Sequence, residues 1–103
     1  MKDKIWEILV PTQFNNGKKI STQYHQKWDQ KIRDISGGLT IFTPAKGQWL
    51  GSRGKLFKEK MIPVRIICSK KEINTIITMT LEYYRQEAVL AYAVGSDIII
   101  RES

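Results

Sequence analysis

The sequence is poor in the residues from which catalytic and metal sites are often built. It holds one cysteine, Cys68, so no disulfide can form within the chain, and one histidine, His25, so a metal site is not expected. The first apolar run, KIWEILVP, is too short for a signal peptide, and no window is long enough to span a bilayer. We therefore expect a cytoplasmic protein with no membrane segment, metal or cofactor.

The composition is that of a folded protein. With 103 residues, 42% hydrophobic and 26% charged, the chain predicts one domain over residues 1–103. Its formal net charge of +7 permits attraction to nucleic acid, phosphate or an acidic partner without establishing any of them. Cys68 lies in VRIICSK, a pattern typical of a buried strand, so we expect a packed thiol rather than a nucleophile.

The first third of the chain predicts a strand followed by a helix. Residues 4–11 alternate loosely as a strand does, and Asn16-Gly17 indicates a turn. Ser21 or Thr22 is a suitable helix N-cap, and Gly37-Gly38 would end the helix. An apolar stripe at helical spacing forms one face of this helix: Tyr24, Trp28, Ile32 and Ile35.

The middle of the chain predicts a β-hairpin. Its first strand covers about residues 39–46 and extends at most to Trp49, the turn is Gly51–Gly54, and the second strand covers about residues 55–68. Pro44 and Pro63 lack the donor that a sheet ladder needs, so each is expected at an edge, a bulge or a break.

The last third predicts a second helix and closing strands. Ser69-Lys70-Lys71-Glu72 matches the capping box that opens a helix. The apolar face of this helix holds Ile73, Ile76, Ile77, Thr80, Leu81 and Tyr84. A strand is expected at residues 88–94, a turn at residues 95–97, and a short last strand at residues 98–101.

This order, β-α-β-β-α-β, predicts an α+β ferredoxin-like sandwich with both helices on one face of an antiparallel sheet and a short extra C-terminal strand. The other sheet face also carries large side chains, because Phe42 alternates with Ile41, and Ile67 alternates with Ile66. A second apolar face implies a homo-oligomer, either a dimer or a trimer.

The segment GGLTIFTPAKGQWLGSRGKLFKEKMIPVRII, followed by YYRQEAVLAYAV, resembles a family of uncharacterised small bacterial domains with a ferredoxin-like fold. The family pattern is Gly-Gly-hydrophobic-Thr, Gly-x-Trp, a Gly turn, a Glu before the third strand and a later Gln-Glu pair. The matching residues are Gly37, Gly38, Thr40, Gly47, Trp49, Gly54, Glu59, Gln86 and Glu87. The resemblance covers about residues 5–95 and implies a fold rather than an activity.

The chain is more distantly similar to PII-type signalling proteins. Those trimers bind nucleotides in clefts between subunits and contact partners through the loop between the second and third strands. The corresponding connection here is short, and no nucleotide-binding signature follows it.

The predicted hairpin is the main candidate binding surface. Basic residues gather on it, with aromatic residues between them: Lys46, Trp49, Arg53, Lys55, Phe57, Lys58 and Lys60. Such a pattern can bind single-stranded nucleic acid, but lysines on an edge strand also prevent unwanted strand pairing. Lys70 and Lys71, at the start of the second helix, form a weaker candidate phosphate site.

No constellation of catalytic residues is recognisable. His25 borders the apolar stripe of the first helix and is expected near the surface. Glu59 and Glu87 can pair with basic neighbours or serve as an acid or base in a cleft. Three functions remain open: a non-enzymatic oligomeric binding or regulatory module, a nucleic-acid-binding protein that uses the basic hairpin, and a small dimeric ferredoxin-like enzyme with His25 or Glu59 near a cleft.

Overall fold

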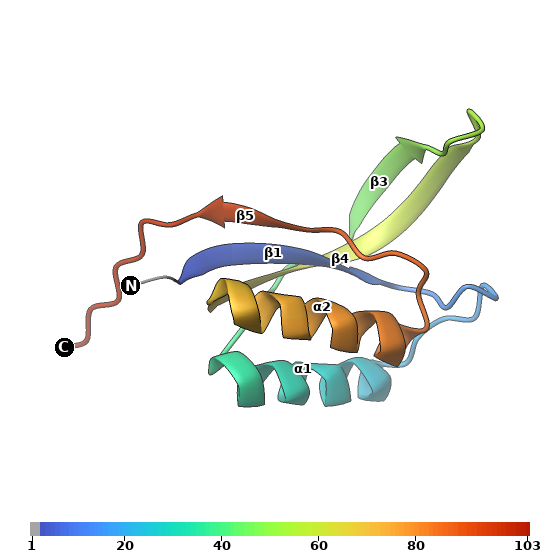
Figure 1. Cartoon of the computed structure of the whole chain (residues 1–103). Coiled ribbons are helices and arrows are strands. Elements are labelled where there is room, and N and C mark those ends of the chain that lie inside the picture. The colour runs from blue at the N-terminus through green and yellow to red at the C-terminus, as the bar shows by residue number, and fades with distance from the viewer. Residues whose placement is uncertain (1–2) are drawn as a thin grey trace.

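A computed structural model describes residues 3–103 and shows a two-layer α+β protein (Figure 1). Its elements follow in this order: β1 (Lys4–Pro11), α1 (Thr22–Ser36), β2 (Thr40–Ile41), β3 (Ala45–Leu50), β4 (Leu56–Cys68), α2 (Lys70–Tyr84) and β5 (Ala91–Gly95). The sheet has the order β2-β4-β1-β5, with β3 also paired to β4, and the pairs are antiparallel. Both helices cover one face, so the predicted ferredoxin-like fold is confirmed.

The predicted first hairpin strand is divided in two by a bulge. The register of β2 opposite β4 (Ile41 opposite Val64) differs by one residue from that of β3 opposite β4 (Ala45 opposite Met61). The extra residue lies in the stretch that contains Pro44. Pro63 faces the same irregularity, because its carbonyl accepts a hydrogen bond of 2.9 Å from the Phe42 amide on that side. Both prolines thus sit where a ladder donor is not needed, as predicted.

The helix ends confirm the local signals in the sequence. The Ser21 side chain caps α1 by accepting from the Tyr24 amide, and Gly37 ends the helix at φ 92° in the left-handed region. At α2 the Ser69 hydroxyl accepts from the Glu72 amide, and the Glu72 carboxylate accepts from the Ser69 amide.

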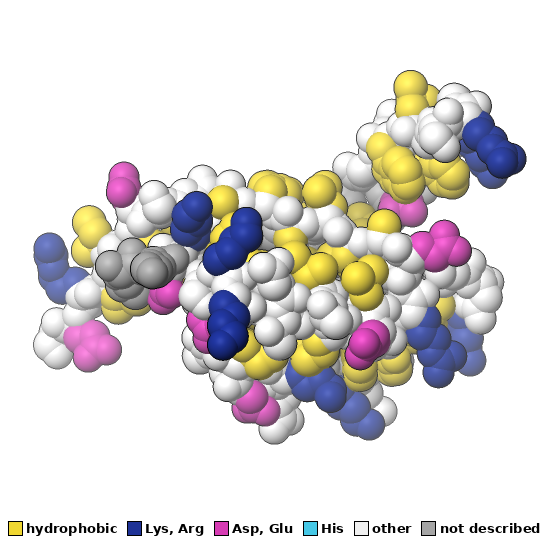
Figure 2. Space-filling view, in the orientation of Figure 1, with side chains coloured by type: hydrophobic (Ala, Val, Ile, Leu, Met, Phe, Trp, Pro, Cys, Tyr) yellow, Lys and Arg dark blue, Asp and Glu magenta, His cyan; other side chains and the backbone are white. Residues whose placement is uncertain are grey.

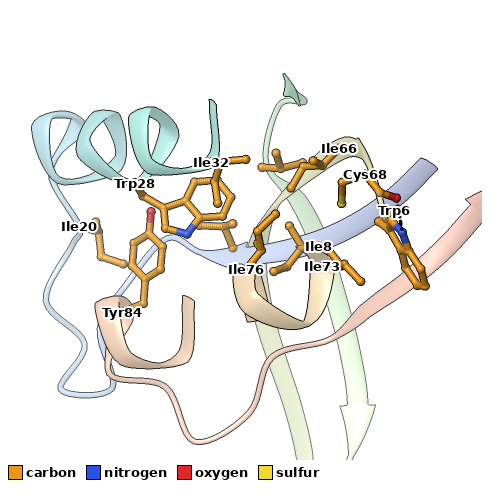
Figure 3. Packing of buried hydrophobic residues seen from close by; sticks show 12 residues of the cluster. Trp6, Ile8, Ile20, Trp28, Ile32, Ile66, Cys68, Ile73, Ile76 and Tyr84 are labelled. Atoms are coloured by element: carbon orange, nitrogen blue, oxygen red, sulfur yellow. Dashed lines mark hydrogen bonds between the residues drawn. The ribbon is translucent and has the colours of Figure 1, made fainter. Parts of the chain in front are cut away.

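The core lies between the helices and the covered face of the sheet (Figure 3). Trp28 and Tyr84 meet there, and the Trp6 indole donates a hydrogen bond of 3.2 Å to the Cys68 carbonyl. Cys68 is 1% exposed, and its burial raises the pKa of the thiol to about 11. This confirms the expectation that the thiol packs as a small apolar group, because a thiolate would not form there near neutral pH.

Two parts of the chain extend beyond this core. The outer half of β4 and all of β3 form a two-stranded hairpin that projects from one end, so the molecule measures 48 × 30 × 23 Å. At the other end, the strand predicted for residues 98–101 does not form, because those residues have no partner within the described chain. The fifth strand arises instead from the division of the hairpin strand at the bulge.

Candidate functional site

A cleft of about 710 Å³ lies between the β1–α1 loop and the inner half of the β3–β4 hairpin. The loop provides one wall, residues 46–48 of β3 and residues 58–61 of β4 provide the other, and Gln86 closes the end near α2. In Figure 2 the hairpin stands clear of the body. The residues that line the cleft thus come from three segments that are far apart in the sequence: the loop, the hairpin and the end of α2.

The loop wall is held in place at both ends. The Thr12 hydroxyl donates to the Lys60 carbonyl at 3.0 Å, which ties the loop to the base of the hairpin. The side-chain amide of Asn15 donates a hydrogen bond of 2.9 Å to the Arg85 carbonyl, which ties the loop to the end of α2. Phe14 packs edge-on against Tyr24 with ring centroids 5.2 Å apart. Gly17 completes the predicted turn with a φ of 83°, which a side chain would strain.

Positive charge dominates the hairpin wall. Lys46 lies directly opposite Lys60 in the β3–β4 ladder, and Lys58 is the next residue on the same face. Among residues 3–103, no carboxylate lies within ion-pair distance of these three lysines. Like charges placed opposite each other destabilise a strand pair, so this cluster favours the binding of an anion.

The remaining polar groups of the cleft can orient a ligand. Gln13, Gln48 and Gln86 offer amide donors and acceptors among the lining residues. Glu59 is the one carboxylate that lines the cleft, and it alternates with Lys58 and Lys60 along β4, so its side chain belongs to the other face of the strand. Gly47, Glu59 and Gln86, which the family resemblance singled out, thus come together here. The loop residues were missed at the sequence level, because nothing local shows that residues 12–17 lie beside the hairpin.

The hairpin tip forms a second surface outside the cleft. Trp49 is 51% exposed and stacks on Phe57 with ring centroids 4.8 Å apart. The Lys55 ammonium lies 5.4 Å from the centre of the Phe57 ring, and Arg53 occupies the turn. The predicted basic hairpin therefore divides into two parts, with Lys46, Lys58 and Lys60 in the cleft and Trp49, Arg53 and Lys55 at the tip.

Other predicted residues lie away from the cleft. The Lys70 ammonium is 5.3 Å from the Trp6 ring, and the Glu72 carboxylate occupies the N-terminus of α2 that Lys70 and Lys71 flank. Glu87 is exposed beyond α2. His25 is half-buried; its Nδ1 lies 2.7 Å from the Tyr84 hydroxyl, and burial lowers the pKa of the imidazole. None of these residues lines the cleft, and the Glu72 carboxylate already caps the helix end where Lys70 and Lys71 were expected to hold a phosphate.

A polar cluster on the open face of the sheet was not anticipated. Glu7 is 8% exposed; its carboxylate accepts a hydrogen bond of 2.9 Å from the Arg65 Nε and another from the Tyr92 hydroxyl. These bonds, the one from Tyr92 foremost, hold the pKa of Glu7 below its usual value. In the sequence, the one sign of this cluster was a glutamate inside an apolar strand. Its partners could not be predicted, because Arg65 and Tyr92 come from β4 and β5, which are distant in the sequence.

Large apolar side chains surround this cluster. The large apolar residues around it remain 36% to 59% exposed: Phe42, Ile67, Leu90 and Val94. Figure 2 shows hydrophobic side chains along the upper surface of the body and on the hairpin. The predicted second apolar face is therefore present.

Within residues 3–103, no three His, Cys, Asp or Glu side chains lie close enough together to hold a metal ion. Neither helix in the described part of the chain has the length and hydropathy of a membrane-spanning helix.

The architecture defines the class to which the protein belongs, the α+β proteins with a ferredoxin-like fold. Solved structures with this fold include the periplasmic divalent cation tolerance protein CutA of Archaeoglobus fulgidus, with a TM-score of 0.70 and 10% identity over 96% of this chain and 88% of that one. CutA of Xylella fastidiosa gives a TM-score of 0.70 and 13% identity, with 97% and 88% covered. A phage SAM lyase in complex with S-methyl-5'-thioadenosine gives 0.65 and 17%, with 92% and 91% covered.

These likenesses concern the fold, because the sequence identities are low. No protein-family model matches the chain, and no curated protein matches it by sequence.

Proposed function

We propose that this protein is a self-associating binding module that holds a small anionic molecule in the cleft between the β1–α1 loop and the hairpin. The observation that carries this proposal is the cluster of Lys46, Lys58 and Lys60 on one wall, without a carboxylate in ion-pair range among the described residues. The opposite wall supplies an aromatic ring, Phe14, and amide groups. Such a mixture of apolar and polar lining is typical of small-molecule sites.

Self-association is supported by the open face of the sheet. Exposed apolar side chains surround the Glu7–Arg65 ion pair there, and a contiguous patch of this kind on a small domain is typical of an interface. Light scattering tests this part: we expect a mass that is a multiple of 11.9 kDa. A monomer at all accessible concentrations would contradict it.

Ligand binding is tested by calorimetry with inorganic phosphate, pyrophosphate and ATP as probe anions. We expect at least one of them to bind, and the double variant Lys46→Gln/Lys60→Gln to weaken that binding tenfold or more. The matched control Lys27→Gln/Lys31→Gln removes the same charge from α1 and should bind as the wild type does. Equal affinities in both variants, or no binding of any probe anion, would overturn the cleft assignment.

The same titrations test two other ligand classes. Divalent cations are titrated because the CutA neighbours are named for divalent cation tolerance, although the described residues offer no cluster of metal-ligating side chains. Short DNA and RNA form the other arm: binding through the tip would fall steeply with salt and would be lost in Arg53→Gln/Lys55→Gln.

Glu59 supports a second candidate, a small enzyme. It is the carboxylate of the cleft, and the phage SAM lyase with this fold carries an adenosine-derived ligand. Under this enzyme hypothesis, Glu59 acts on a nucleoside substrate, whereas His25 lies outside the cleft and has no catalytic role. Incubation with S-adenosylmethionine, followed by chromatography, is the test: turnover by the wild type that Glu59→Gln abolishes would favour the enzyme over the binding module.

We keep the cytoplasm as the proposed compartment. The Archaeoglobus neighbour is described as periplasmic, so cell fractionation with an antibody to the chain is the direct test.

A further inference from the structure

A strand-forming segment without a partner follows β5. Residues 97–102 read Asp-Ile-Ile-Ile-Arg-Glu, and none of them forms a helix or a strand. Ile99 is 83% exposed and Ile100 is 73% exposed. Consecutive β-branched residues prefer extended structure, so the segment has the composition of a strand but pairs with no strand of the described chain.

The projecting hairpin has the opposite deficiency, namely strand edges without partners. β3 pairs with β4 alone, and β1 leaves β4 at the pair Pro11–Met61, so the stretch from Leu56 to Lys60 pairs with β3 alone. Within residues 3–103, both edges of this two-stranded ribbon therefore lack a strand partner, and the Thr12 hydroxyl bonds one edge only at its base, at the Lys60 carbonyl. An isolated ribbon is only marginally stable in water, and free edges tend to recruit another strand.

The apolar side chains of the two parts match in their arrangement. On the hairpin, Leu50 lies opposite Leu56 on one face, and Trp49 stacks on Phe57 on the other. In an added strand, neighbouring side chains point to opposite faces, so Ile99 would cover one of these pairs and Ile100 the other. One short strand would thus cover exposed apolar surface on both faces of the hairpin tip.

Charge also matches, and the contact must form between chains. The hairpin tip carries Arg53 and Lys55, whereas residues 97–102 carry Asp97 and Glu102 against the single Arg101, which leaves the segment with a net charge of −1. The two parts lie at opposite ends of the molecule, which is 48 Å long (Figure 1). A hairpin and a segment that suit each other, but cannot meet within one chain, fit two copies.

We propose that residues 97–102 of one copy add as a strand to a free edge of the β3–β4 hairpin of a second copy. The inference rests on the proposed self-association and names the parts that make one of its contacts. It leaves the cleft lysines and Glu59 unused, so ligand binding and this contact can succeed or fail separately.

A charge exchange between two variants tests this contact. The hairpin variant is Arg53→Glu/Lys55→Glu, and the tail variant is Asp97→Lys/Glu102→Lys. Alone, each variant places like charges in the contact, so we expect its self-association to weaken tenfold or more in sedimentation at low ionic strength. When the two variants are mixed in equal amounts, the acidic hairpin of one meets the basic segment of the other, and the unchanged hairpin meets the unchanged segment. Association should then return to within about threefold of the wild type.

The control is Lys27→Glu/Lys31→Glu, which makes the same charge change on α1 and should assemble as the wild type does. The inference is overturned if either variant alone assembles normally, or if the mixture associates no better than its parts. A wild type that stays monomeric overturns the self-association itself, and calorimetry with the Lys46 and Lys60 variant reports on the cleft independently of both.

Discussion

Glu7 shows how one side chain links stability to pH. Its carboxylate is buried on the open sheet face, and hydrogen bonds from Tyr92 and Arg65 lower its pKa. A carboxyl group whose pKa is lower in the folded state adds stability above its unfolded pKa, and that stability is lost as the pH falls through the folded value. Glu7 should therefore support the fold at neutral pH and cease to do so in acid.

Tyr92→Phe removes the main cause of this shift. The pKa of Glu7 then rises toward its usual value, so we expect the midpoint of acid unfolding to move to higher pH. Circular dichroism across an acid titration measures it. Glu82→Gln, a change at an exposed carboxyl group on α2, is the control and should leave the midpoint in place. An unchanged midpoint in Tyr92→Phe would contradict this account of the cluster.

Thr80 is a second residue whose polar atom matters more than its size. It is fully buried; its hydroxyl accepts a hydrogen bond of 3.0 Å from the Trp28 indole and donates one of 2.6 Å to the Ile76 carbonyl. Thr80→Val leaves the indole donor buried without a partner, which costs about 1 to 3 kcal/mol of unfolding free energy.

Urea denaturation followed by tryptophan fluorescence measures that cost. Thr78→Val is the matched control, because Thr78 also bonds to a carbonyl one turn back, at 3.2 Å, but is exposed. Equal losses in the two variants would show that the indole bond contributes little.

At the scale of the element, the start of α2 depends on the reciprocal bonds between Ser69 and Glu72. Ser69→Ala removes the acceptor for the Glu72 amide, and we expect a loss of about 1 kcal/mol in unfolding free energy. The urea midpoint measures the loss. Ser52→Ala, in the exposed hairpin turn, should change it by much less; a similar loss in both would contradict a special role for the cap.

At the scale of the whole molecule, the open sheet face should govern assembly. Leu90 is 59% exposed, and its carbonyl accepts a hydrogen bond of 3.1 Å from the Leu9 amide. It lies two residues before Tyr92, which is opposite Glu7, so its side chain shares the open face with that cluster. Leu90→Lys puts a charge into the proposed interface and should shift the protein toward the monomer. Light scattering measures the shift.

The matched control for Leu90→Lys is Ile41→Lys. Ile41 is 51% exposed but lies opposite Val64, on the other register face of the sheet. It should leave the assembly unchanged; dissociation by both variants, or by neither, would remove the open face from the assembly.

The sequence alone was enough for features that depend on close neighbours. The caps at Ser21, Gly37 and Ser69 follow from residues within one helical turn, and the apolar stripes follow from regular spacing. The order of these elements then predicted the ferredoxin-like fold, and Lys46, Lys58 and Lys60 were recognised as candidates.

The tertiary structure decided which of these candidates lie together. It placed three hairpin lysines in the cleft and left Trp49, Arg53 and Lys55 at the tip, because a bulge divides the first hairpin strand and the hairpin projects beyond β1. It also left residues 98–101 without a strand, although their composition predicted one. The physical reason is that strand pairing, clefts and buried ion pairs depend on contacts between distant segments, whereas caps and stripes do not.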